Sequence, residues 1–403
     1  MTERWLTILG IGEDGLDGLP HASRALIAGA ALVVGGARHL ALAANEISGD
    51  RLAWPSPIEA AFPAIIAARP TPVLILASGD PTCYGIFSAA ARHVPAAEIR
   101  ILPAPSAFAL ARAALGWSAQ DCAEISFCGR PLAAIVPLLQ PGAKILALSA
   151  DANTPAQVAA LLADRGFPNA PMTVLEALGG PNERLRTIPA GAFALADIHP
   201  LNMLAIEVRA EPGARIVPLA TGLPDDAYAH DGQITRREIR AITLSSLAPH
   251  RGETLWDIGA GAGSIGIEWM LRHPANRAIA IEQHPGRAAR IADNASSLGV
   301  PALRILQGEA PAALDGLPRP DAVFIGGGLT APGLLDAAWE ALPTDGRLVA
   351  NAVTHESEIV LAAAQSRLGG SLTRIAIARL GEVGTMHAFR PAMTVTQFVV
   401  VKL

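Results

Sequence analysis

The sequence predicts an α/β protein that combines two different domains in one chain. Short apolar segments alternate with helix-forming segments along nearly all of the 403 residues, as in open sheets covered by helices. Glycine-rich turns follow apolar segments near residues 10–15 and 259–263, a pattern typical of the carboxyl edge of a parallel sheet. The turns of one half are not repeated in the other, and the chain is too long for one ordinary core. We therefore expect two unlike domains.

Composition narrows the classes of partner. Apolar residues make up 51% and charged residues 17% of the chain, which provides ample core material. The net charge of -5 and the lack of a long basic run argue against a nucleic-acid partner. Cys83, Cys122 and Cys128 show no C-x-x-C spacing, so we expect reduced packing residues and no metal site. No apolar run is long enough for a signal sequence or a membrane span, so we expect no membrane partner and a cytoplasmic location.

The first strand of the chain runs into a glycine-rich turn. The segment WLTILGIG continues as EDGLDG and places a G-x-G-x-x-G pattern at Gly10, Gly12 and Gly15. The next strand, ALVVGG, ends without an acid. The ribose ligand of a dinucleotide site is therefore missing, and the pattern alone is a weak signal.

A second turn follows the strand PVLILA, which comes after a predicted helix over 58–68. This strand stops at Ser78-Gly79-Asp80-Pro81, where the proline fixes the turn. The strand IRILPA then runs into PSAFALARAALGW, in which Ser106 is expected to cap a helix of good helix formers. The Gly79–Pro81 turn either belongs to a ligand site or simply joins a strand to a helix.

The rest of the first half continues the alternation, and a turn-rich segment then separates the halves. The segments EISFCG, AKILALS, MTVLEAL and NMLAIEV are expected strands, with a helix over 155–165. Residues 209–232 are rich in proline and glycine and are expected to form a linker. The predicted domains are therefore 1–208 and 233–403.

The second half opens with an arginine-rich helix. Thr235 is the expected N-cap, with Glu238 three residues later. Arg236, Arg237 and Arg240 follow on the first turns. Guanidinium groups pair with carboxylates, so these arginines either meet an anionic substrate or are solvated surface residues.

The segment LWDIGAGAGSIGIE predicts a nucleoside-cofactor site. A strand ends in Asp257, glycines follow at Gly259, Gly261 and Gly263, and a helix then leads to a second strand that ends in Glu282. Two strand ends and a helix start thus meet at one crevice. The glycines allow a ligand close to the backbone, and the helix start offers free N–H groups.

The identity of the cofactor depends on charge. The segment GAGSIG, with Glu282 about 20 residues on, also meets the dinucleotide fingerprint. Asp257 argues against a dinucleotide because its carboxylate would lie near a pyrophosphate. S-adenosylmethionine carries an ammonium, a sulfonium and a ribose diol, and Glu282 can accept hydrogen bonds from the diol. Glu309, after the strand ALRIL, is placed to hold the adenine amino group. We predict S-adenosylmethionine, with a dinucleotide as the alternative.

The last strands suggest where the substrate lies. DAVFIGGG ends in three glycines. Enzymes that methylate base amino groups usually show an Asn/Asp-Pro-Pro-aromatic turn at this position, which this chain lacks. The three glycines leave room for a bulky flat substrate instead. LTRIAIARL and TVTQFVVVKL are expected to close the sheet as a terminal hairpin. Asn351 ends the preceding strand, His355 follows it, and His387 and Arg390 lie in the hairpin connection. We take these four residues as candidates to bind or protonate the substrate.

Several of these motifs together resemble known families. LGIGEDG, ASGDPTCYG, PAPSAFALARAALGW, CGRP and LGGPNERLRT resemble the tetrapyrrole methylase family, most closely the members that methylate a corrin precursor at carbon 5. LPDDAYAHDGQITRREIRAITLSSLAP followed by LWDIGAGAGSIGIE resembles the decarboxylating carbon-15 precorrin methylases. The match spans nearly the whole chain.

The resemblance implies both folds and cofactor sites. It implies a tetrapyrrole-methylase fold, with a cleft between two α/β subdomains, followed by a Rossmann-like class I methyltransferase with a seven-stranded sheet. It also implies one S-adenosylmethionine per domain. The implied contacts are Gly10, Gly12, Gly79, Asp80, Pro81, Ser106 and Ala107 in the first domain and Asp257, Gly259, Gly261, Gly263, Glu282, Glu309 and Ala310 in the second. The chain departs from the first family at Ala107, where a serine is frequent, and at Cys128, where a histidine is usual.

By the same resemblance the substrate is a precorrin tetrapyrrole of cobalamin biosynthesis. The first domain would methylate carbon 5, and the second would methylate carbon 15 and decarboxylate a ring acetate. The expected partners are this small molecule and further copies of the chain, as a homo-oligomer. Three alternatives stay open: a dinucleotide-dependent reductase, a methyltransferase acting on RNA or another substrate, and a half that serves only as a cofactor-binding scaffold.

Overall fold

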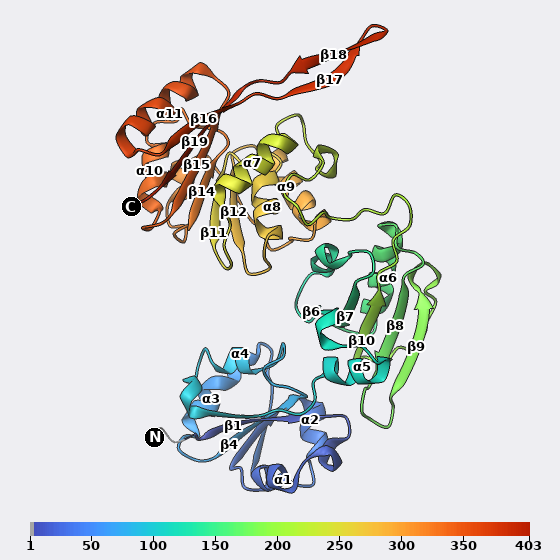
Figure 1. Ribbon diagram of the computed structural model, residues 1–403. Coiled ribbons are helices and arrows are strands. Elements are labelled where there is room, and N and C mark those ends of the chain that lie inside the picture. Colours follow the sequence, from blue (N-terminus) through green and yellow to red (C-terminus); the bar gives the residue numbers. More distant parts are fainter. Residues whose placement is uncertain (1–3) are drawn as a thin grey trace. The chain divides into compact units, whose positions relative to one another are not determined.

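The computed structural model describes residues 4–403, so the first three positions of the expected N-terminal domain lie outside the described residues. The chain forms two compact units (Figure 1). One comprises the residues up to Arg130 together with Gln140–Arg215, and the other comprises Ile216–Leu403 together with the short segment Pro131–Leu139. The change of unit at residue 215 falls inside the segment that the sequence suggests as a linker.

The first unit begins with a five-stranded parallel sheet in the order β3-β2-β4-β1-β5. Its strands are β1 (Leu6–Ile11), β2 (Leu32–Gly35), β3 (Asp50–Ala53), β4 (Val73–Ser78) and β5 (Ile99–Leu102). Alternate residues of β1 face opposite layers, because Leu6 and Ile8 pack with α3 (Phe62–Ala67) and α4 (Phe87–Ala90), and Leu9 and Ile11 pack with α1 (His21–Ala28). Both faces are therefore buried, as parallel sheets require.

A second five-stranded sheet, in the order β6-β7-β10-β8-β9, completes this unit. Its strands are β6 (Cys122–Ser126), β7 (Lys144–Leu148), β8 (Pro171–Glu176), β9 (Arg184–Pro189) and β10 (Asn202–Glu207), with the helices α5 (Ala107–Leu115) and α6 (Thr154–Asp164). The predicted cap of α5 is confirmed, since Ser106 Oγ accepts a hydrogen bond from the Ala109 N–H at 3.1 Å.

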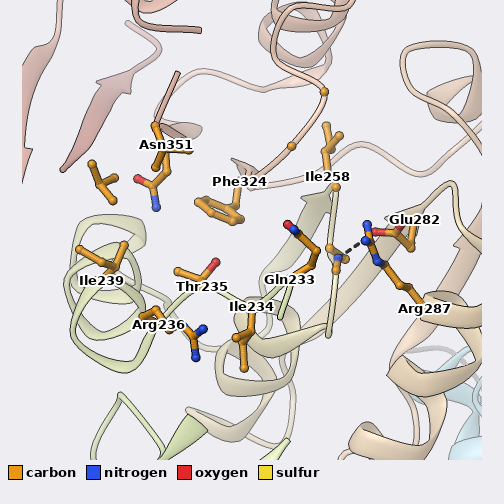
Figure 2. A pocket seen from close by; sticks show the side chains of 18 of the residues that line it. Gln233, Ile234, Thr235, Arg236, Ile239, Ile258, Glu282, Arg287, Phe324 and Asn351 are labelled. Carbon is orange, nitrogen blue, oxygen red and sulfur yellow. Dashed lines mark hydrogen bonds between the residues drawn. The ribbon is translucent and has the colours of Figure 1, made fainter. Parts of the chain in front are cut away.

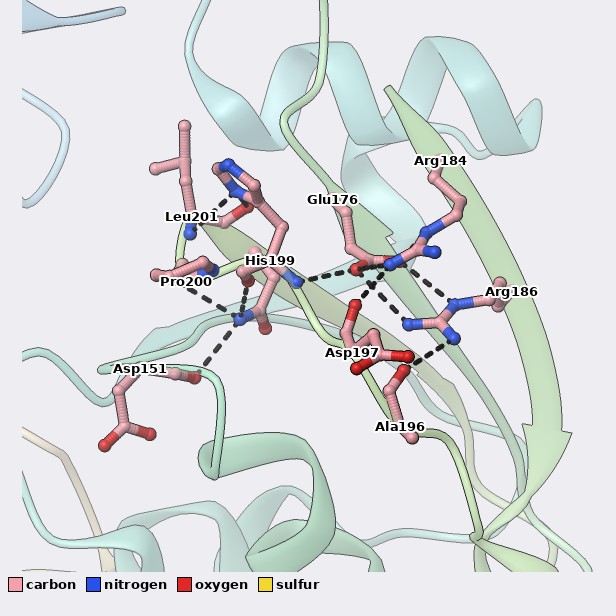
Figure 3. Close-up of polar contacts among 10 residues, drawn as sticks. Asp151, Glu176, Arg184, Arg186, Ala196, Asp197, His199, Pro200 and Leu201 are labelled. Carbon is pink, nitrogen blue, oxygen red and sulfur yellow. Dashed lines mark hydrogen bonds and ion pairs between the residues drawn. The ribbon is translucent and has the colours of Figure 1, made fainter. Parts of the chain in front are cut away.

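The edge strand β9 was not predicted from the sequence, and a buried carboxylate anchors it. Figure 3 shows Glu176, at the end of β8, accepting hydrogen bonds from Arg184, Arg186 and the His199 N–H. The Glu176 side chain is fully buried, and these donors offset the cost of burying its charge. The cluster therefore stabilises the outer edge of the sheet.

The second unit contains the seven-stranded sheet that the family resemblance implies, in the order β13-β12-β11-β14-β15-β19-β16. Its strands are β11 (Thr254–Ile258), β12 (Arg277–Glu282), β13 (Arg304–Gln307), β14 (Ala322–Ile325), β15 (Arg347–Ala352), β16 (Ser371–Ile375) and β19 (Val395–Val401). The five strands from β13 to β15 in this order are parallel to one another, and β19 runs antiparallel to its neighbours β15 and β16. The strand order reverses between β11 and β14, which is where such sheets bind ligands.

Five α-helices accompany this sheet: α7 (Arg237–Leu247), α8 (Ser264–Leu271), α9 (Pro285–Ser297), α10 (Leu334–Ala341) and α11 (His355–Leu368). The helix start differs from the prediction, because Arg236 and not Thr235 occupies the N-cap position and makes no capping side-chain hydrogen bond. The buried Arg240 guanidinium instead donates to the Thr235 carbonyl. This bond fixes Thr235 ahead of the helix.

The predicted terminal hairpin is only partly right. β16 and β19 do pair, but the chain between them leaves the sheet and forms a separate two-stranded sheet of β17 (Ala378–Val383) and β18 (Met386–Pro391). This hairpin extends away from the seven-stranded sheet (Figure 1), and every residue of β18 is exposed.

The segment before α7 is packed into the second unit, so it is no free linker from residue 216 onward. Its anchor is Glu268 of α8, whose side chain is fully buried. The carboxylate accepts hydrogen bonds from the Gly222 N–H at 2.7 Å, the Leu223 N–H at 2.9 Å and the Tyr228 hydroxyl at 2.9 Å. Arg240 supplies the compensating positive charge.

Three further findings concern partners and surroundings. Cys83, Cys122 and Cys128 are free thiols. Within residues 4–403 no helix is both long and apolar enough to cross a membrane. In the same part of the chain, no three His, Cys, Asp or Glu side chains gather closely enough to hold a metal ion. The cytoplasmic location stays a prediction.

Candidate active sites

A cavity of about 750 Å³ opens at the carboxyl edge of the seven-stranded sheet, a size typical of cofactor sites. Its lining includes Gly259 and Gly261 after β11, Glu282 at the end of β12 and Gly326–Gly328 after β14. Figure 2 shows Glu282 and Arg287 at one end of this cavity. The cavity therefore lies at the point where the strand order reverses.

The three glycines after β11 are required by backbone geometry. Gly259, Gly261 and Gly263 have positive φ angles of 68°, 59° and 76°, which other residues rarely adopt. A Cβ atom on Gly259 would lie 2.6 Å from the Gly327 nitrogen, and one on Gly261 would lie 2.9 Å from the Gln233 carbonyl oxygen. Gly259 and Gly261 line the cavity, whereas Gly263 caps the start of α8.

Glu282 fits the expected role of binding a ribose. Its side chain lines the cavity although the residue is only 4% exposed. One oxygen accepts the Gly261 N–H at 2.9 Å and the other accepts the His284 N–H at 3.0 Å. Each carboxylate oxygen has a further lone pair, so Glu282 can still accept hydrogen bonds from two vicinal hydroxyl groups.

Asp257 differs from its expected place. It is 1% exposed, does not line the cavity and accepts the Gly266 N–H at 2.8 Å from beneath the glycine turn. Burial raises the pKa of Asp257 to about 7, the Gly266 hydrogen bond opposes this shift, and the nearby Glu282 adds to it. Its second oxygen has no hydrogen-bond partner in the described structure. Asp257 therefore faces away from the cavity, but two carboxyl groups close to one turn favour a cation over a pyrophosphate there.

Glu309 and Ala310 lie where the sequence suggests. Both line the cavity just after β13, the strand that pairs with β12. The Gly308 N–H donates to the Glu282 carbonyl at 3.1 Å, which joins this loop to the end of β12. These residues and Glu282 therefore form one end of the cavity, suited to a nucleoside.

The opposite end of the cavity contains Asn351, with Phe324 and Ile258 lying between the two ends (Figure 2). Asn351 donates to Thr243 Oγ at 2.9 Å and accepts from the Gln397 amide at 3.0 Å. These bonds hold the side chain at the end of β15. An amide does not titrate, so Asn351 can position a substrate but is no acid or base.

The other three catalytic candidates lie outside the cavity lining. His355 is exposed at the start of α11, and His387 and Arg390 are exposed on β18. Arg390 donates to the Glu382 carbonyl within the hairpin at 2.5 Å. None of the three contacts the cavity in this structure, because α11 starts outside the lining and β18 extends away from the sheet, so their roles stay predictions.

The three arginines near α7 have three different environments. Arg236 lines the cavity and lies 3.5 Å from Asp225, whereas Arg237 is exposed and outside the lining. Arg240 is fully buried, with its Nε 2.5 Å from Glu268. The expectation that Arg240 binds a substrate carboxylate is therefore wrong, because the buried Glu268 already occupies its guanidinium.

Sequence reasoning missed most of one wall of the cavity, of which it named only Arg236 as a site residue. Gly232–Arg236 line it directly, and Asp231 anchors this segment by ion pairs with Arg287 at 2.9 Å and Arg290 at 3.3 Å. The Arg287 hydrogen bond, more than any other contact, holds the pKa of Asp231 well below its usual range. The wall lies in the segment that resembles the decarboxylating carbon-15 precorrin methylases, but its irregular sequence after a turn-rich stretch indicates only a loop and not which residues line a cavity.

In the first unit three strand ends meet at the predicted Gly79 turn. The Gly79 N–H donates to the Ile11 carbonyl at 3.1 Å, and the Ala104 N–H donates to the Gly79 carbonyl at 3.1 Å. A Cβ atom on Gly10 would lie 1.8 Å from the Gly79 oxygen. The ends of β1, β4 and β5 are thus joined at one point, where only glycine fits.

The remaining predicted residues of the first unit surround this turn. Asp80 accepts hydrogen bonds from the Thr82 N–H at 2.8 Å and hydroxyl at 2.7 Å, so its carboxylate shapes the turn. A Cβ atom on Gly79 would lie 3.1 Å from Ser106 Cα, and Ala107 is the first residue of α5. Pro81 is buried after Asp80, and Gly12 lies just beyond the end of β1.

Comparison with known proteins identifies the family. The model for tetrapyrrole (corrin/porphyrin) methylases matches residues 6–194, and the model for the precorrin methyltransferase domain matches residues 226–402. A precorrin-6Y C(5,15)-methyltransferase [decarboxylating] of Sinorhizobium sp is 55% identical over 394 residues, which cover 98% of this chain and 95% of the relative. The chain belongs to the precorrin-6Y C5,15-methyltransferase (decarboxylating) family. Methyltransferases of this family take the methyl group from S-adenosylmethionine.

Another member of the family matches over the same share of the chain, and a solved structure matches the second unit's half of it. A Mycobacterium tuberculosis (strain CDC 1551 / Oshkosh) relative of the same name is 41% identical, over 98% of this chain and 100% of the relative. The crystal structure of the C-terminal domain of the Rhodobacter capsulatus protein is 46% identical and covers 46% of this chain and 100% of that chain, with a TM-score of 0.44.

The raised pKa of Asp257 predicts a pH-dependent stability that Asp257→Asn removes. The unfolded carboxyl ionises near 3.8 and the folded one near 7, so the contribution to stability is complete below pH 3.8 and is lost as pH rises through about 7. The difference of about 3 pKa units corresponds to roughly 4 kcal/mol. Urea denaturation of the wild type and of Asp257→Asn at several pH values measures this pH dependence of the free energy of unfolding, with Asp226→Asn as an exposed control. Equal pH dependence in wild type and Asp257→Asn would contradict this assignment.

Proposed function

We propose that this chain is a bifunctional S-adenosylmethionine-dependent methyltransferase that acts on a precorrin macrocycle. It would methylate carbons 5 and 15 and decarboxylate a ring acetate, as a step of cobalamin biosynthesis. The main support is the 55% identity, over 98% of the chain, to a relative named for both methylations and for the decarboxylation. The cavity at the carboxyl edge of the second sheet supports a methyl-donor site in that unit.

The two activities are assigned to different units. A Salmonella typhimurium relative named cobalt-precorrin-6B C(15)-methyltransferase (decarboxylating) is 34% identical to 39% of this chain, and that stretch covers 83% of the relative. A protein named for the carbon-15 reaction alone thus corresponds to less than half of the present chain. Because the precorrin methyltransferase model matches residues 226–402, we assign carbon-15 methylation and decarboxylation to the second unit. Carbon-5 methylation then falls to the first.

The proposal includes one S-adenosylmethionine per unit. In the second unit, Gly259 and Gly261 allow a ligand close to the backbone, and Glu282 can accept from a diol. The carboxyl groups of Asp257 and Glu282 suit a ligand that carries positive charge and no phosphate. In the first unit, the support is the tight meeting of Gly10, Gly79 and Ser106 at three strand ends.

The protein's contribution to the chemistry is mainly alignment. When bound, S-adenosylmethionine supplies an electrophilic methyl group, which an electron-rich ring carbon of the substrate attacks. The apolar side chains of Ile258 and Phe324, in the middle of the cavity, exclude water, and Asn351 holds the substrate end in a fixed geometry. Alignment and exclusion of water lower the barrier without a strong base.

The decarboxylation needs only a held carboxylate and an electron sink. The bond between the acetate CH₂ and its carboxyl carbon breaks, carbon dioxide leaves, the electron pair enters the conjugated ring, and a proton from solvent then adds to the macrocycle to give the methyl group. Arg236, which lines the cavity, can hold a carboxylate of the macrocycle by a charge-assisted hydrogen bond.

Point variants of the full chain should separate the two methylations. Glu282→Gln is expected to weaken donor binding in the second unit tenfold or more, since hydrogen bonds to a charged group are worth about 1.5–3 kcal/mol. Its product from precorrin-6Y should carry the carbon-5 methyl and retain the acetate carboxyl.

Asp80→Ala should mainly reduce carbon-5 methylation. Mass spectrometry with methyl-labelled S-adenosylmethionine measures both, with Glu340→Gln as control. Equal loss of both reactions in each folded variant would contradict the division.

We also propose that the enzyme is a homo-oligomer that associates through the β17–β18 hairpin. Large apolar side chains are exposed along it, including Leu380 at 60%, Met386 at 74% and Phe389 at 71%. Exposed apolar clusters of this kind typically mark protein contacts. A second copy of the chain offers an identical surface.

Sedimentation measurements test this assembly. The wild-type chain is expected to sediment as a dimer or larger species, and the double variant Leu380→Ser/Phe389→Ser is expected to shift toward the monomer. Leu219→Ser, which changes a 76% exposed leucine outside the hairpin, should leave the mass unchanged. A monomeric wild type, or a double variant that keeps its mass, would rule out the hairpin as the interface.

A further inference from the structure

A partly exposed ion pair lies in the lining of the second-unit cavity. Arg379, at the start of β17, is paired with Glu238, in the first turn of α7, and both side chains line the cavity. The Arg379 Nη2 contacts one carboxylate oxygen, and its Nε lies 3.4 Å from the other. The pair therefore joins two segments that are 141 positions apart in the sequence.

This ion pair is easily exchanged. The side chains of Arg379 and Glu238 are 49% and 39% exposed, and pairs with this much solvent contact contribute about 0–1 kcal/mol. The pairing raises the pKa of Arg379 and lowers the pKa of Glu238, so both groups are charged at neutral pH. Nε and Nη2 together present the fork that binds a carboxylate through two hydrogen bonds. An incoming carboxylate can thus replace Glu238 at little cost.

The surroundings of Arg379 suit a flat ligand with acidic side chains. The apolar side chains that line this end of the cavity are Ile239, Val353, Ile377, Met393 and Val395. In the described part of the chain, three arginines line the cavity: Arg236, Arg287 and Arg379. Arg287 lies beside Glu282 at the cofactor end, where it pairs with Asp231. Arg236 and Arg379 are therefore the cations beside the apolar lining. An apolar wall with cations at its rim matches a macrocycle that carries carboxylates at its edge.

We propose that Arg379 binds a carboxylate side chain of the macrocycle, and that Glu238 holds its guanidinium in the cavity lining until the substrate replaces it. This inference rests on the proposed function, because it takes the ligand to be a tetrapyrrole with acetate and propionate arms. It adds a substrate-binding residue from the base of the hairpin, a segment in which only His387 and Arg390 were expected to act. The hairpin base thereby becomes part of the substrate site.

A simpler role for Arg379 would be to neutralise Glu238, whose charge would otherwise repel an anionic substrate. The two roles differ in a double variant. If Arg379 only neutralises Glu238, removing both charges should restore binding. If Arg379 contacts the substrate, the double variant should bind as weakly as Arg379→Gln alone.

Steady-state kinetics of the full-length enzyme with precorrin-6Y and saturating S-adenosylmethionine test the proposal. Arg379→Gln is expected to raise KM for carbon-15 methylation about tenfold or more, the loss of a charge-assisted hydrogen bond pair. The kcat should change less than twofold, and Kd for S-adenosylmethionine by calorimetry should be unchanged. Glu238→Gln should leave KM equal or lower, and Glu238→Gln/Arg379→Gln should keep the high KM. Arg379→Lys, which keeps the charge but loses the fork, should lie between.

The control is Arg374→Gln, which removes a 73% exposed arginine that pairs with Glu358 at 3.4 Å and lies outside the cavity lining. It should keep the wild-type KM. The proposal is overturned if Arg379→Gln keeps the wild-type KM, if the double variant regains it, or if Arg374→Gln raises KM equally. These outcomes differ from failure of the proposed function, in which the wild-type enzyme binds S-adenosylmethionine but transfers no methyl group to precorrin-6Y.

Discussion

The second unit depends on the way two buried carboxyl groups hold one glycine turn. Glu282 accepts the Gly261 N–H of this turn at 2.9 Å, and Asp257 accepts the Gly266 N–H in the first turn of α8 at 2.8 Å, so the turn after β11 and the helix that follows it are both fixed. The glycines allow this turn to contact the loop after β14 at distances that a side chain would prevent. The cost is a raised pKa at Asp257, as is typical of functional sites. The shape of the cavity and the kind of cofactor that it suits both follow from this placement of two carboxyl groups and a glycine turn.

A second buried charge pair extends this site toward the substrate. Glu268 and Arg240, both fully buried, fix the segment that precedes α7, and the far end of that segment lines the cavity. Removing either partner would leave an unpaired buried charge, which costs several kcal/mol. The wall formed by Gly232–Arg236 is therefore held by contacts to α8 and, through Asp231, to α9.

Local patterns in the sequence predicted the parts of the site that depend on local geometry. The glycine turn at Gly259 and Gly261, the acid at the end of β12 and the Ser106 cap were each predicted from a few adjacent residues. The roles of Arg236 and Arg240 could not be told apart, because both look equivalent until packing buries one against a glutamate 28 positions away. The departure of β17 from the sheet has the same origin, since LTRIAIARL is a continuous strand pattern and only tertiary structure ends it at Ile375.

The central claim is that one chain contains two methyl-donor sites of different architecture. Equilibrium dialysis of the folded full-length protein against labelled S-adenosylmethionine measures the number of sites directly. The account predicts a stoichiometry of two per chain, which falls to one when Glu282→Gln is measured at a ligand concentration that saturates only the first unit. A stoichiometry of one in the wild-type protein, under conditions that saturate it, would contradict the account.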